Sequence, residues 1–124
     1  MAIYTELPIY TLGCDLISLS LDVHMQMKRE LRRSLSDEIT KLCTAMIVDI
    51  AAANTMRGEK RIERIDLMQE RLIIVRVLLR VGYLKKVIPQ TLWARSVEVL
   101  DAVGAQAGGW RNHTGATLSA APAA

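Results

Sequence analysis

Apolar residues recur every three or four positions along four long segments of this chain, and very few turn-forming residues separate them. The 124 residues include only 7 glycines and 3 prolines. Because β-proteins need frequent turns, so few turn-forming residues favour a few long helices. We expect helices over about residues 7–26, 34–56, 59–83 and 90–109, with a charged connection at 27–33. Short connections predict an all-α fold, an antiparallel up-down-up-down four-helix bundle.

Each expected helix carries an apolar line that we assign to the core. The lines are Ile9, Leu12, Leu16, Leu19 and Val23; Leu35, Ile39, Leu42, Met46, Ile50 and Ala53; Ile65, Leu72 and Leu79, with Ile62, Met68 and Val75 beside them; and Trp93, Val97, Leu100 and Gly104 next to Leu92, Val99, Val103 and Trp110.

Local signals suggest where these helices begin and end. Ser34 with Asp37 predicts a cap at the start of the second helix. Gly108 and Gly109 predict the end of the fourth. Residues 112–124 have no periodicity and are expected to form a disordered tail, so the bundle domain should span residues 1–111.

The third and fourth helices are apolar beyond one face. A helix that is apolar on several sides must be covered on several sides, which predicts a homo-oligomer. The candidate interface residues are Ile74, Val77, Leu78, Leu92, Val99 and Trp110.

Composition narrows the class of protein. Apolar residues make up 51% and charged residues 23%, which is typical of a globular chain. Cys14 and Cys43 stand far apart in apolar segments, so we expect both thiols to be buried, reduced and unpaired. The start "MAIYTELP" does not resemble a signal peptide, and charges interrupt every long apolar run. These features favour a cytoplasmic protein with no membrane association.

Residues that support catalysis are scarce. The chain has no glycine-rich phosphate loop in a strand–helix context, and it has no Glu-x-x-His pair of the kind found in di-iron bundles. His24 and His113 are the only histidines, and no Ser-His-Asp or Cys-His arrangement has supporting context. We therefore expect no catalytic residue, no cofactor and no metal ion.

The arginines are the most informative charged residues. The net charge is +3, and arginine supplies 11 of the 16 positive charges, which favours planar contacts with phosphate or carboxylate groups. Arg76 and Arg80 stack on one side of "RLIIVRVLLRVGYLKK" (71–86), apart from Arg71. From the residues alone they either pair with carboxylates such as Asp49 or Asp101, or bind phosphate. The full candidate set for binding nucleic acid is Arg57, Arg61, Arg64, Arg71, Arg76, Arg80, Lys85 and Lys86.

Four short motifs in order resemble one known family. They are "LPIY" (7–10), "AAANTMR" (51–57), "RVLLR" (76–80) and "LDAVGAQAGGW" (100–110). They resemble the accessory variability determinant (Avd) proteins of diversity-generating retroelements. This family belongs to a wider four-helix-bundle group that includes proteins encoded in ribosomal RNA intervening sequences.

The resemblance implies a non-enzymatic partner of a reverse transcriptase. Family members form a basic ring, a pentamer in our expectation, that binds the reverse transcriptase and structured RNA and supports mutagenic cDNA synthesis. DNA is a further candidate ligand. Arg76 and Arg80 match the family's basic motif. We favour phosphate binding at these two positions, because their own helix offers no local acidic partner. The alternative is an intervening-sequence-type bundle that binds ribosomal RNA or a protein. A small enzyme or metal-binding bundle is the third interpretation.

Overall fold

The computed structural model describes residues 3–120, and every regular element in this range is helical. In chain order the elements are η1 (Tyr4–Glu6), α1 (Pro8–Gln26), α2 (Arg29–Leu31), the π-helical turn η2 (Arg32–Ser36), α3 (Asp37–Thr55), α4 (Glu59–Leu84) and α5 (Gln90–Ala120). Four of them are long, and they confirm the all-α fold that the periodicity predicts.

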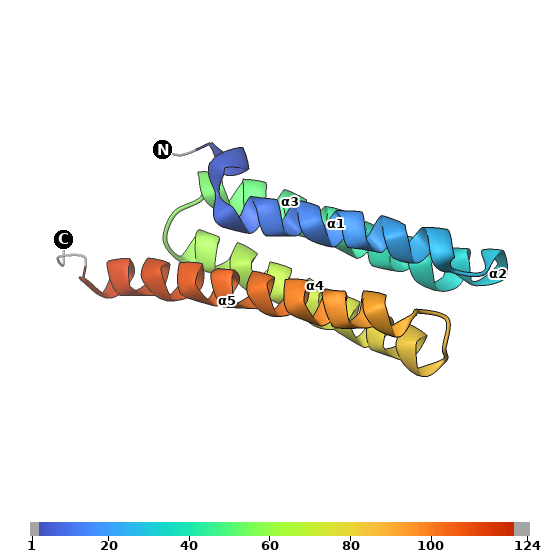
Figure 1. Cartoon of the computed structure of the whole chain (residues 1–124). Coiled ribbons are helices and arrows are strands. Elements are labelled where there is room, and N and C mark those ends of the chain that lie inside the picture. The colour runs from blue at the N-terminus through green and yellow to red at the C-terminus, as the bar shows by residue number, and fades with distance from the viewer. Residues whose placement is uncertain (1–2, 121–124) are drawn as a thin grey trace.

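The four long helices enclose a single core. α3 packs against α1 and α4, and α5 packs against α4 and α1. Figure 1 shows α1 lying beside α3 and α4 beside α5, with the start of α1 and the end of α5 at the same end of the molecule. Within residues 3–120, no helix combines the length and the apolar character needed to cross a membrane.

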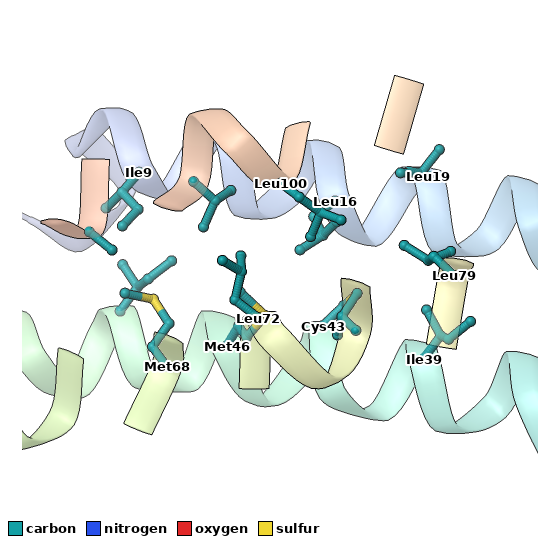
Figure 2. Close-up of a cluster of buried hydrophobic side chains, with 14 of the residues drawn as sticks. Ile9, Leu16, Leu19, Ile39, Cys43, Met46, Met68, Leu72, Leu79 and Leu100 are labelled. Carbon is teal, nitrogen blue, oxygen red and sulfur yellow. The ribbon is translucent and has the colours of Figure 1, made fainter. Parts of the chain in front are cut away.

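The predicted apolar lines supply most of the core. Figure 2 shows Leu16 and Leu100 on one side of the core and Met46, Met68 and Leu72 on the other, with their side chains directed toward one another. These are almost fully buried, and so are most other members of the four lines. Large apolar side chains that leave water in this way provide the main favourable free energy of folding.

The second long helix has no separate capped start. Residues 29–36 are already helical and lead directly into α3. Ser34 does not cap the helix; its hydroxyl donates to the Leu31 carbonyl at 3.3 Å. Ser36 likewise makes no capping hydrogen bond to α3. The predicted cap is therefore wrong, because a chain that is already helical has no free N–H groups to cap there.

The end of α4 forms a left-handed turn at an unusual residue. Lys86 has a φ of 61°, and its N–H donates to the Tyr83 carbonyl while that of Val87 donates to the Gly82 carbonyl. This is the Schellman pattern, in which the left-handed position normally holds glycine. The fold therefore places a lysine where a side chain is disfavoured by about 1 kcal/mol.

The last helix is longer than predicted. α5 continues through Gly108 and Gly109 to Ala120, so the expected end of the helix was wrong, and so was the expectation of disorder for 112–120. Glycine lowers helix propensity by about 1 kcal/mol each, but tertiary contacts override that preference. Thr114 is buried, and Arg111 Nε donates to Asp66 Oδ1 on α4 at 2.6 Å. Residues 121–124 of the predicted tail lie outside the described range.

The two cysteines differ from each other. Both are free thiols, as expected, and Cys43 is buried, but Cys14 is exposed. Position 14 is two residues from Leu16 on α1, about 200° around the helix from the core line. The expectation of burial was therefore wrong for Cys14, because an apolar segment also has an outward face.

Candidate interaction surface of helix α4

Two of the candidate RNA-binding arginines point inward, toward a buried carboxylate. Arg64 Nε donates to Asp49 Oδ1 at 2.8 Å, and Arg71 Nη1 donates to both Asp49 oxygens at 2.7 and 2.8 Å. The Asp49 side chain is 0% exposed, whereas Arg64 and Arg71 are 27% and 26% exposed. These three residues, which we call the Asp49 cluster, link α3 to α4. The sequence offered Asp49 as a partner for Arg76 or Arg80, but the structure pairs it with Arg64 and Arg71 instead.

Arg61 also serves the bundle itself. Its Nε donates to the Ala53 carbonyl at 2.9 Å, and its Nη2 to the Asn54 carbonyl at 3.3 Å, which satisfies the end of α3. Its guanidinium lies 5.5 Å from the centre of a Trp110 ring, at cation–π distance. Arg61, Arg64 and Arg71 were candidates for nucleic-acid binding, but the structure places carbonyls and a carboxylate of the same chain against them.

The two arginines of the "RVLLR" motif have different surroundings. Arg76 Nη2 donates to Asp101 Oδ1 on α5 at 2.9 Å, which is one of the two alternatives that the sequence left open. This pair is solvent-accessible, with exposed fractions of 36% and 64%. Arg80 is exposed, and no hydrogen bond or ion pair joins it to any residue between 3 and 120. Only Arg80 of the two keeps its full charge available.

Two lysines lie just beyond Arg80. Lys85 and Lys86 are exposed and have no acidic partner in the part of the chain that the structure describes. We call Arg80, Lys85 and Lys86 the cationic end of α4. Arg57, the remaining candidate, is also solvent-accessible but lies at the opposite end of α4, before its first turn.

An apolar stripe runs along the outside of α4 toward the cationic end. It consists of side chains that are 45–63% exposed: Ile73, Ile74, Val77, Val81 and Leu84. Spacings of three and four residues place them on one face of the helix. The sequence predicted Ile74 and Val77 as interface residues but missed the other three, although the same helical spacing would have found them.

The other predicted interface residues are less available to a neighbouring subunit. Leu92 is only 6% exposed and belongs to the core of this chain, so its assignment to an interface was wrong. It lies on the inner face of α5, which periodicity alone did not distinguish from the outer one. Leu78, Val99 and Trp110 are half-buried and pack against the core.

One histidine has both a serine and an aspartate nearby. His24 Nδ1 lies 2.8 Å from Ser36 Oγ and 3.6 Å from Asp37 Oδ1. A catalytic triad needs the serine and the acid on different ring nitrogens and a serine that substrate can reach. Here both approach the same nitrogen, and Ser36 is fully buried. This contact therefore joins α1 to the start of α3.

Potential metal ligands are scattered within residues 3–120. No three His, Cys, Asp or Glu side chains gather there in a group that could hold a metal ion. Every buried side-chain nitrogen or oxygen of the described residues has a hydrogen-bond partner.

Comparisons of the chain with protein-family models, with curated protein sequences and with solved structures gave no match. The Avd family is therefore a resemblance carried by the four sequence motifs alone. The surface formed by the apolar stripe and the cationic end of α4 is the feature on which a function can be argued from geometry.

Proposed function

We propose that this chain is a non-enzymatic accessory protein of a diversity-generating retroelement. In this proposal the subunit is an antiparallel up-down-up-down bundle that assembles into a ring-shaped homo-oligomer, a pentamer, in the cytoplasm. The oligomer binds structured RNA and the reverse transcriptase and so supports mutagenic cDNA synthesis. The ion pairs Arg76–Asp101 and Asp66–Arg111 support the antiparallel arrangement, since the α5 number falls as the α4 number rises.

The observation that carries the proposal is the combination of an exposed apolar stripe with uncompensated positive charge at its end. Exposed apolar residues that cluster, rather than scatter, are typical of surfaces that bind another protein. The stripe is therefore suited to a neighbouring subunit or to the polymerase. The cationic end is suited to RNA, because Lys and Arg that neutralise phosphates provide most of the sequence-independent affinity for nucleic acid.

Lys86 adds an argument from backbone strain. Its φ of 61° favours glycine, yet a lysine occupies the position. Strained backbone positions tend to cluster where function requires a particular side chain. A lysine that lowers stability while adding exposed charge at the cationic end is expected when that charge binds a ligand.

The proposal predicts a reverse transcriptase gene beside this one, and it is tested by cDNA synthesis with that enzyme and its template RNA. We expect full-length cDNA only when the chain is added. Val77→Asp in the stripe, or Arg80→Ala with Lys86→Asn in the cationic end, should each reduce the yield at least about tenfold. Asparagine tolerates the left-handed conformation at position 86, so this substitution removes charge without disturbing the turn.

The matched control is Arg95→Ala. Arg95 is exposed but pairs with Asp22 on α1 at 2.9 Å, away from the α4 surface. The substitution removes a positive charge from a different surface and should leave the cDNA yield unchanged. The absence of a reverse transcriptase gene near this one, or cDNA synthesis that does not depend on the chain, would contradict the proposed function.

A further inference from the structure

A second basic site lies at the other end of α4. A surface pocket of about 380 Å³ opens where α3 turns into α4 and the last turns of α5 pass by. Its lining residues are Arg57, Gly58, Arg61, His113, Thr114, Thr117 and Leu118. Three of the seven can carry a positive charge, and none is acidic. We call this the α3–α4 pocket.

The positive groups of the pocket are not neutralised within the chain. Arg57 and the His113 side chain make no hydrogen bond or ion pair with any residue from 3 to 120. Arg61 donates only to the neutral carbonyls of Ala53 and Asn54, so its charge has no carboxylate partner. This differs from the Asp49 cluster, where the arginine charges are compensated.

The hydroxyl groups of the pocket do not compete as donors. Thr114 Oγ1 donates to the Trp110 carbonyl at 2.8 Å, and Thr117 Oγ1 donates to the His113 carbonyl at 2.9 Å. The donors left for a ligand are therefore those of Arg57 and His113, together with the Arg61 N–H groups that do not serve the end of α3. Such a donor set selects an anion with several acceptor oxygens.

The backbone at the pocket adds to the same preference. Gly58 precedes α4, has a φ of 61° and makes no side-chain cap, so the N–H groups of the first turn lack intrahelical partners. A Cβ at Gly58 would lie 3.3 Å from Leu118 Cδ2, and the positive φ disfavours any side chain. Glycine thus keeps this side of the pocket open. The positive end of the helix dipole supports anion binding beside the three side chains.

We propose that the α3–α4 pocket binds a phosphate monoester, and that its source is the terminal phosphate of an RNA strand. The identification of the source rests on the proposed function, whereas the chemistry of the pocket does not. A monoester carries nearly two negative charges and three acceptor oxygens, which match two guanidinium groups and an imidazole better than a diester of the RNA backbone does. The volume exceeds that of phosphate alone and leaves room for the terminal nucleoside against Leu118.

The experiment compares two RNA hairpins that differ only at the 5′ end, one with a monophosphate and one with a hydroxyl. Binding to the full chain is measured by fluorescence anisotropy with a 3′ label. We expect the phosphorylated hairpin to bind about tenfold more tightly, the size that one charge-assisted hydrogen bond supplies. Arg57→Ala with His113→Ala should reduce this preference to less than about twofold. Arg61 is left unchanged, because it also holds the end of α3.

Two controls separate the pocket from general RNA binding. Arg80→Ala, at the far end of α4, should weaken the binding of both hairpins equally and preserve the preference for the phosphorylated one. Inorganic phosphate at millimolar concentration should remove the preference in the wild type, a result that does not depend on how any variant folds.

The outcomes distinguish the source of the phosphate and the fate of each proposal. One outcome would overturn the pocket and leave the proposed function standing. In it, the wild-type chain binds RNA with no preference for a phosphorylated end, and calorimetry detects no heat when inorganic phosphate is added. The opposite outcome would keep the pocket as a site for free phosphate and overturn the proposed function. In it, calorimetry shows that the wild type binds inorganic phosphate, Arg57→Ala with His113→Ala abolishes that binding, and the wild type binds no RNA.

Discussion

The Asp49 cluster should be the most sensitive charged feature of the fold. Asp49 is completely buried and accepts three hydrogen bonds from Arg64 and Arg71. Removing one partner of a buried ion pair destabilises proteins by about 3–5 kcal/mol, because the other charge stays behind without compensation. The effect should depend on which partner is removed, since the carboxylate is more deeply buried than the guanidinium groups.

Loss of both arginines is the most damaging change. Arg64→Met with Arg71→Met keeps the apolar stems but leaves the Asp49 carboxylate buried and unpaired. We expect this double variant to lose at least about 5 kcal/mol of unfolding free energy. Asp49→Ala alone should lose about 3 kcal/mol, because both arginines are about a quarter exposed and can turn toward water.

The sharpest test is a triple variant. Adding Asp49→Leu to Arg64→Met and Arg71→Met removes the last buried charge and replaces the cluster by apolar side chains. Such replacements are often neutral or stabilising, so the triple variant should recover most of the stability that the double variant loses. Asp101→Ala is the control, since it breaks an exposed pair with Arg76 and should change stability by less than about 1 kcal/mol.

These free energies are measured by urea unfolding, followed by circular dichroism at a fixed protomer concentration, since subunit association would otherwise shift the midpoint. A triple variant no more stable than the double would refute the reasoning, because it would mean that the unpaired carboxylate is not what destabilises the double variant.

Three further predictions concern single positions. Burial raises the pKa of the Cys43 thiol to about 12, so at pH 8 it should stay protonated and react with iodoacetamide much more slowly than exposed Cys14; equal rates by mass spectrometry would contradict this. Gly82→Ala places a methyl group against Ile88 Cδ1 and should lower the free energy of unfolding by about 1–3 kcal/mol. Gly108→Ala meets nothing within 4 Å and should raise it by up to about 1 kcal/mol in the same urea assay. The opposite order of stabilities would refute the packing of the α4–α5 turn. In the proposed homo-oligomer, Val77→Asp should leave only a species near 13.8 kDa by light scattering, and an unchanged oligomer mass would remove the stripe from the subunit interface.

The sequence predicted the helices well because their cores follow a simple period. The lines through Leu16, Ile50 and Leu72 recur at three- and four-residue spacing, and only one face of each helix meets its neighbours. The start of α4 at Glu59 was also predictable, since Gly58 marks the break. The end of α5 was not, because Gly108 and Gly109 oppose a helix that packing against the rest of the fold maintains.

The candidate site was harder to predict, because the charge of a side chain does not show which group it contacts in the fold. Arg64 and Arg71 stand in the same arginine-rich stretch as Arg57, yet only the first two meet Asp49 across the helix pair. Which arginines are neutralised depends on how α3 lies against α4, which one sequence does not specify. The left-handed backbone conformation of Lys86 likewise had no sequence signal, because lysine rarely adopts it.

The measurement that tests the central claim most directly is the salt dependence of RNA binding. The affinity of the chain for a structured RNA hairpin is measured by anisotropy between about 50 and 200 mM salt, for the wild type, for Arg80→Ala with Lys86→Asn, and for Arg95→Ala. If the cationic end of α4 binds phosphate, the double variant should bind more weakly, and the magnitude of its slope of log K against log salt should fall by at least about 0.7 for each RNA phosphate that the variant no longer neutralises. The Arg95→Ala variant should keep the wild-type slope. Equal slopes for all three proteins, or a wild type that does not bind RNA, would contradict the account.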